Sequence, residues 1–203
     1  MDAGVNIIGF AVFACAMVGT PGPANMVLMA AGARFGLRPS LPFAAGVILG
    51  KQLIIWPIGF GLMTFAATVP WLFTALKWGS AAYILYLAWR IALSRIRPGE
   101  AGAIPPGFAS GLIVHPLNPK AWVMITAGFT GFVAEGTPAF TATLGIALVL
   151  LSAQIVLQPL WCWGGERIAA LVGGRPAERW VMLALAGATV LSVFYALASG
   201  GTP

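Results

Sequence analysis

Charged residues are scarce in this 203-residue chain: only 8% of positions are Asp, Glu, Lys or Arg, whereas 60% are hydrophobic. A soluble domain carries roughly 25% charged residues, because its surface faces water. The chain has too few charges to cover such a surface, so lipid must surround most of it. The net charge of +6 does not indicate nucleic-acid binding, because the basic residues are thinly spread and form no basic helix face.

Residues that bind metals or carry out catalysis are equally few. The chain has one histidine, two cysteines and five acidic residues, and no acidic residue lies inside an apolar run. This excludes most metal sites and the nucleophile–base or paired-carboxylate sites of an intramembrane hydrolase. Cys15 and Cys162 both lie in apolar runs, which is typical of small buried residues rather than a disulfide. We therefore predict no enzymatic activity, no metal and no cofactor.

Long apolar runs dominate what is present. A membrane span needs about 20 apolar helical residues. Six spans are predicted, at residues 5–33, 41–68, 71–89, 108–132, 140–163 and 180–199. The predicted fold class is an all-α membrane protein of six transmembrane helices. The near-continuous hydropathy leaves no room for a soluble module, so residues 1–203 are expected to form a single transmembrane domain.

The arginines are distributed unevenly between the gaps. All eight follow the first, third or fifth span: Arg34, Arg38, Arg90, Arg95, Arg97, Arg167, Arg175 and Arg179. The other gaps and the two termini contain at most Lys77, near the start of the third span. Because cytoplasmic loops are enriched in Lys and Arg, the arginine-rich side is predicted to be cytoplasmic and both termini to lie outside.

Two of the predicted spans are interrupted near their middle by proline motifs. Residues 20–25 read Thr-Pro-Gly-Pro-Ala-Asn in the first span, and residues 115–120 read His-Pro-Leu-Asn-Pro-Lys in the fourth. Proline removes a helical donor and clashes with the preceding turn, so neither helix can continue unbroken. The freed backbone groups need partners in protein or a watery cavity, since lipid offers none.

The spacing of the motifs predicts an inverted repeat of three plus three helices, with repeat one at about 1–95 and repeat two at about 105–203. Spans one and four would then run in opposite directions. Paired Gly/Pro interruptions in corresponding helices indicate a transporter's substrate site near the middle of the membrane. The alternative is that both motifs are kinks relieved by packing alone.

These motifs carry a resemblance to a known family. Pro21-Gly22-Pro23, followed by glycines at 32, 36, 46 and 50, resembles the lysine exporter (LysE/RhtB) family of amino-acid exporters. Residues 81–90, Phe108-Ala-Ser-Gly-Leu and Asn118-Pro119-Lys120-Ala121 are similar to that family too, so the likeness covers essentially the whole chain.

The resemblance implies export of amino acids or similar small metabolites, driven by the proton gradient, across a bacterial cytoplasmic membrane. One departure is informative. Relatives often carry an acidic residue after the position of Gly50, whereas this chain has Lys51. A cation there is poorly suited to a cationic substrate, which favours a neutral or anionic one.

The candidate substrate-binding residues come from the two motifs and the second span: Pro21, Gly22, Pro23, Asn25, Lys51, Asn118, Pro119 and Lys120. A lysine at membrane depth is costly and therefore a functional candidate. Lys51 has an alternative role, because its side chain could extend to the membrane interface. The asparagines could cap the broken helices as well as bind. Gln154 and Gln158, four residues apart, could line the cavity or bridge helices.

Two further features have simpler expected roles. His115 could relay protons, but a satisfied interior histidine is more common, so it is left outside the predicted site. Gly46 and Gly50 are spaced for close packing of the second span against another helix.

The predicted function is export of amino acids or related metabolites by alternating access between the two halves. A channel or passive pore would share the polar residues, and gradient-dependent, saturable flux would distinguish an exporter from it. A non-transport membrane subunit is the more remote alternative, since a scaffold gains little from buried charge. The expected partners are a small-molecule substrate and the lipid bilayer. A homo-oligomer is left open.

Overall fold

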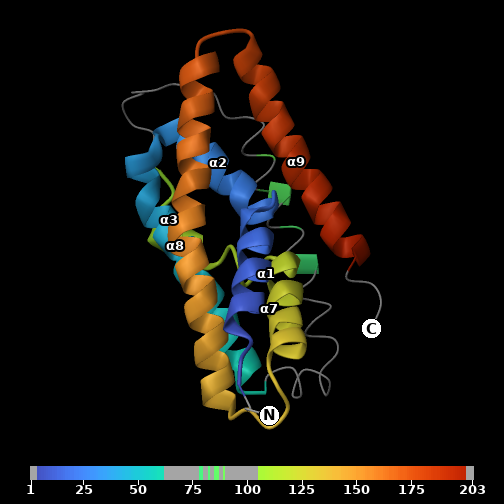
Figure 1. The fold of residues 1–203 in the computed structure, drawn as a ribbon. Helices are drawn as coiled ribbons and strands as arrows, with labels where there is room; N and C mark the ends of the chain where they lie inside the picture. The colour runs from blue at the N-terminus through green and yellow to red at the C-terminus, as the bar shows by residue number, and fades with distance from the viewer. Residues whose placement is uncertain are drawn as a thin grey trace.

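The computed structural model describes residues 4–61 and 105–199, with isolated helical positions at 78, 79, 82, 85, 86 and 89. Within these residues it is all-helical, in the order α1 (Ile7–Gly19), α2 (Pro23–Phe35), α3 (Leu37–Gly59), α6 (Phe108–Leu112), α7 (Pro119–Phe132), α8 (Ala139–Val172) and α9 (Ala177–Ser199) (Figure 1). The predicted third span, at 71–89, lies almost wholly outside the described residues.

The first predicted span is broken where its prolines indicate. The N–H of Thr20 still bonds to the carbonyl of Ala16, but Pro21 cannot continue the helix. Pro23 then starts α2 at its first position, where a missing N–H costs nothing. The two halves, of 13 residues each, are bent by 54° to one another.

The fourth predicted span is also broken, but not near its middle. It divides into α6, of only 5 residues, and α7, of 14 residues. The turn between them occupies residues 113–118, so it begins two residues ahead of the predicted motif at 115–120 and contains most of it. Side-chain and turn hydrogen bonds in residues 113–118, described below, hold this segment without a continuous helix.

Two other predicted boundaries were displaced. The second span starts at Leu37 rather than at residue 41, because Gly36, with a φ of 85°, lets α2 turn directly into α3. Helix α8 has 34 residues and continues to Val172, past the predicted end at 163. At 1.5 Å per residue it is about 50 Å long, so it extends beyond a hydrocarbon core of about 30 Å.

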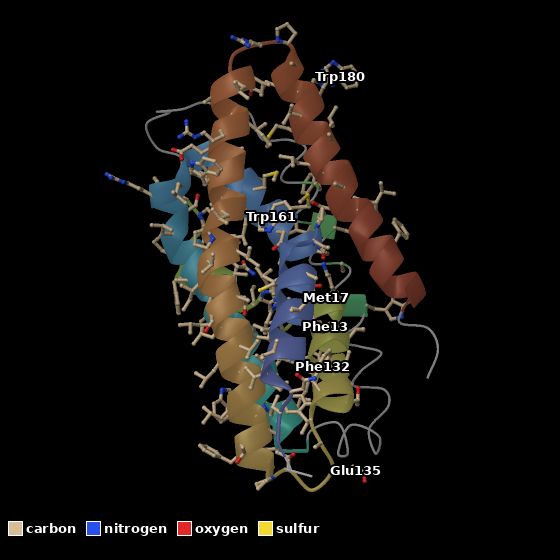
Figure 2. All side chains as sticks on the ribbon, viewed as in Figure 1. Phe13, Met17, Phe132, Glu135, Trp161 and Trp180 are labelled. Carbon is tan, nitrogen blue, oxygen red and sulfur yellow. The ribbon has the colours of Figure 1, made fainter. Side chains whose placement is uncertain are left out.

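Two described helices, α3 and α8, are long and apolar enough to cross a membrane, and a third span results if α1 and α2 count as one bent span. The ends of the helices fall into two separate groups. The α2–α3 turn at Gly36 lies against Glu166 near the end of α8, whereas the chain start pairs with the end of α7 through Asn6 N–H to the Phe132 carbonyl, 2.8 Å. Figure 2 shows Glu135 near that second end and Trp180 near the first.

Glycines let the helices approach to backbone contact in two seams. Between α2 and α8, Gly32 lies against the Cys162 carbonyl and Gly165 against the Met29 carbonyl. Between α3 and α6, three glycines lie against carbonyls of the facing helix: Gly46, Gly50 and Gly111. The predicted packing role of Gly46 and Gly50 is confirmed, with α6 as the partner of α3.

Adjacent glycines in α8 offer a direct test of the α2–α8 seam. We expect Gly165→Ala to lower the free energy of unfolding by about 1–3 kcal/mol, because its methyl group would displace the Met29 backbone. Gly164→Ala is the control, since its methyl group would meet only the Met29 Cε, at 3.8 Å. Thermal unfolding in detergent, followed by size-exclusion chromatography, compares them; equal melting temperatures would contradict the seam.

Candidate substrate site between the broken helices

The first elbow, between α1 and α2, satisfies its own freed carbonyls. The side-chain amide of Asn25 donates to the Val18 carbonyl at 2.7 Å and to the Thr20 carbonyl at 2.8 Å. Asn25 is 5% exposed, so water cannot easily replace these bonds. Each carbonyl left unpaired would cost about 1–3 kcal/mol. Asn25 therefore stabilises the break that Pro21 creates.

The second elbow, between α6 and α7, is organised in the same way. Asn118 is the N-cap of α7, and its side-chain oxygen accepts the Lys120 N–H at 3.1 Å. The Trp122 indole donates to the Pro116 carbonyl at 2.9 Å. Asn118 is buried, so its cap supplies the partner that the Lys120 N–H loses at the break and that lipid cannot provide.

Lys120 joins the two elbows. Its Nζ donates to the Thr20 hydroxyl at 2.9 Å and lies 3.4 Å from the carbonyl oxygens of both Thr20 and Pro21. Gly22 makes room for it, because a Cβ there would lie 3.1 Å from Nζ. Two motifs about a hundred residues apart in the sequence thus meet at one point.

A small cavity lies where the elbows meet. Its volume is about 20 Å³, and it is lined by residues of both elbows, α3 and α8: Met17, Val18, Gly22, Ala24, Asn25, Lys51, His115, Asn118, Lys120, Ala121, Met124 and Gln158. A single water needs roughly 10–15 Å³, so the cavity has room for little more than one. An amino acid would fit only after the walls separate.

The cavity is electropositive. Lys51 enters from α3 and is 2% exposed, and no hydrogen bond or ion pair links it to another residue of the described segments. Lys120 supplies a second cation, and the N-caps of α2 and α7, Gly22 and Asn118, are both in the wall. Helix N-termini carry partial positive charge. Among the lining residues that the structure describes there is no carboxylate, so the site suits an anionic group.

Five of the eight predicted residues line the cavity: Gly22, Asn25, Lys51, Asn118 and Lys120. Pro21 contributes its carbonyl to Lys120. Pro23 and Pro119 are the first residues of α2 and α7, so they position the helices. Lys51 is buried at the cavity, which argues against the alternative that it extends to an interface.

A second wall was predicted only in part, because Gln154 and Gln158 were expected to line the cavity or bridge helices and His115 was left outside the predicted site. His115 Nε2 lies 3.2 Å from the side-chain nitrogen of Gln154 and 3.5 Å from that of Gln158. His115 and Gln158 line the cavity. The signal was visible in part, as the only histidine beside a break and two glutamines four residues apart, but no pattern along the chain linked them.

A helical membrane protein with a polar cavity between interrupted helices has the architecture of a membrane transporter. Comparison with known proteins agrees. The family model for LysE type translocators matches residues 15–200. A "Cysteine/O-acetylserine efflux protein" of Salmonella choleraesuis (strain SC-B67) is 30% identical over 72% of this chain and 75% of its own length. The protein of the same name from Escherichia coli (strain K12) is 26% identical over 82% and 85%.

The chain therefore belongs to the LysE type translocator family. It is a multi-pass membrane protein of a bacterial exporter family, as the resemblance implied. Membership of a transporter family also confirms that it is not an enzyme. The comparison with solved structures gives no significant match.

The two cavity lysines should affect stability in opposite directions. Replacing Lys51 by Met removes a buried cation that has no partner in the described segments. We therefore expect the free energy of unfolding to rise by about 1–4 kcal/mol. Replacing Lys120 by Met breaks its bonds to Thr20 and Pro21 and should cost about 1–3 kcal/mol of stability. Melting temperatures of the purified variants in detergent measure both. Equal destabilisation by the two would show that Lys51 is structurally paired.

Proposed function

We propose that this chain exports a small neutral amino acid, holding its carboxylate between Lys51 and Lys120. The observation that carries the proposal is the convergence of two lysines and two helix N-termini on one buried cavity, whose described lining contains no carboxylate. A carboxylate would compensate that charge, whereas a cationic side chain would add to it. The printed names of the relatives, cysteine/O-acetylserine efflux proteins, fit this class of substrate.

Binding would proceed by exchange of partners at Lys120. In the described conformation its ammonium group is held by the Thr20 hydroxyl and by carbonyls of the first elbow. An incoming carboxylate would compete for the same donors. Binding of the carboxylate by Lys120 would weaken the contact of Lys120 with the first elbow and allow the cavity to widen. The site would thus couple occupancy to the relative position of α7 and the α1–α2 elbow.

The remaining parts of the proposal concern the transport cycle. We infer six spans in two inverted halves, with alternating access produced by rocking of one half against the other. The proton gradient would drive export, with Lys51, Lys120 and His115 as the groups at the cavity able to exchange protons. A channel remains the second candidate, because it would use the same polar wall without coupling.

Reconstituted vesicles test the function directly. Wild-type protein should give saturable flux of radiolabelled cysteine that an imposed proton gradient accelerates, and Lys120→Ala and Asn118→Ala should abolish it. Thr130→Ala is the control on the same helix, because that hydroxyl bonds only to carbonyls of its own helix, at Thr126 and Ala127. Normal flux in both site variants defeats the site assignment, and non-saturable flux indicates a channel.

We infer that the end carrying Arg34, Arg38 and Arg175 faces the cytoplasm, with the N-terminus outside. Single cysteines test this in a variant lacking Cys15 and Cys162. A cysteine replacing Glu135, in the exposed α7–α8 loop, should react in intact cells with a membrane-impermeant maleimide. A cysteine replacing Arg175, in the exposed α8–α9 loop, should react only in inverted vesicles. The reverse pattern would invert the topology.

A further inference from the structure

The cavity has a second wall, opposite in character to the lysine wall. It is formed by His115 and Gln158, which line the cavity, and Gln154 lies against His115 outside the lining. The three residues are 4%, 1% and 0% exposed, respectively. We call these three residues the amide–imidazole cluster. Gln154 and Gln158 lie one turn apart on α8 and both approach the same ring nitrogen of His115. All three side chains are uncharged when the imidazole is neutral.

The cluster has more hydrogen-bonding groups than it uses. Within the described residues, His115 Nδ1 and the side-chain oxygens of Gln154 and Gln158 have no partner. Rotating either glutamine amide by 180° exchanges its oxygen for its nitrogen. One of the two atoms still lacks a partner, because both glutamines face the same ring nitrogen of His115. Buried polar groups without partners are uncommon in proteins and call for an explanation.

Their position supplies one. Gln158 and His115 border the same cavity as Lys51 and Lys120. A solute whose carboxylate meets the lysines would place the rest of its structure toward this second wall. An amide can turn to offer either a donor or an acceptor. The wall therefore suits an uncharged group that hydrogen-bonds, such as a hydroxyl, a thiol or an ester carbonyl.

We infer that the amide–imidazole cluster selects solutes with an uncharged polar side chain and rejects apolar solutes of the same size. The inference rests on the proposed function. A purely apolar side chain would widen the cavity and still leave the amides unpaired. Sites that hydrogen-bond part of a substrate discriminate far more strongly against an analogue lacking that group than apolar pockets discriminate by size.

Competition for cysteine flux in reconstituted vesicles tests this selectivity. Serine and 2-aminobutyrate differ mainly by a hydroxyl in place of a methyl group. In wild-type protein, serine should inhibit labelled-cysteine flux at a concentration at least about tenfold lower than 2-aminobutyrate does. In Gln158→Leu the two inhibitors should become nearly equal, chiefly because serine binds more weakly.

Gln52→Leu is the matched control. Gln52 also lies inside the membrane domain, but its amide donates to the Ala147 carbonyl at 3.3 Å and does not line the cavity. The inhibitor ratio, defined as the inhibitory concentration of 2-aminobutyrate divided by that of serine, should remain that of wild type. If Gln158→Leu is not recovered as folded protein, Gln154→Leu replaces it, because this change removes the nearer partner of His115. Its inhibitor ratio should also fall.

The outcomes separate the two proposals. Absence of saturable cysteine flux in wild-type protein would overturn the proposed function. Saturable flux in which serine and 2-aminobutyrate inhibit equally would overturn the selectivity inference alone. So would a wild-type inhibitor ratio in the folded glutamine variant. A ratio lost in the glutamine variant and kept in Gln52→Leu supports the inference.

Discussion

Backbone hydrogen bonding in lipid is the constraint on which this site depends. A helix interrupted inside a membrane exposes carbonyls and amides that lipid cannot satisfy. Here the Asn25 amide takes the Val18 and Thr20 carbonyls, and Lys120 reaches the same elbow from α7. The polar side chains that stabilise the breaks are therefore the ones that surround the cavity. The structural roles of these side chains and the binding roles proposed for them coincide, because both require polar atoms at one place.

Much of this arrangement could be predicted, because the controlling residues leave strong local signals. The break at Pro21 and Pro23 follows from proline chemistry, and a lysine beside a break is conspicuous in a chain with so few charges. The start of the second break was predicted to within two residues. It follows from the motif at 115–120, because Pro116 lacks the donor that would bond to the Leu112 carbonyl. The contacts of α6 with α3 and the Trp122 bond to Pro116 could not be predicted in this way, because they depend on how the chain folds.

The members of the amide–imidazole cluster were noted in the sequence, but their meeting could not be predicted. His115 lies in the turn before α7, whereas Gln154 and Gln158 lie far along the chain in α8. Their meeting depends on how α8 and the turn after α6 are packed together, and α6 is held against α3, which itself packs on α8. Periodicity identifies the polar face of one helix. It cannot say which distant turn that face will meet.

The packing also limits where the cavity can open. Helix α2 is held to α8, and α6 to α3, by glycines in contact with facing backbone, so sliding along either seam would bring backbone atoms into collision. The α7 N-terminus, by contrast, is linked to the first elbow through the flexible side chain of Lys120. A lysine can change partners without moving either backbone. In the proposed transport cycle, the interface between α7 and the α1–α2 elbow is therefore the place where solute binding would cause movement at the least cost in packing.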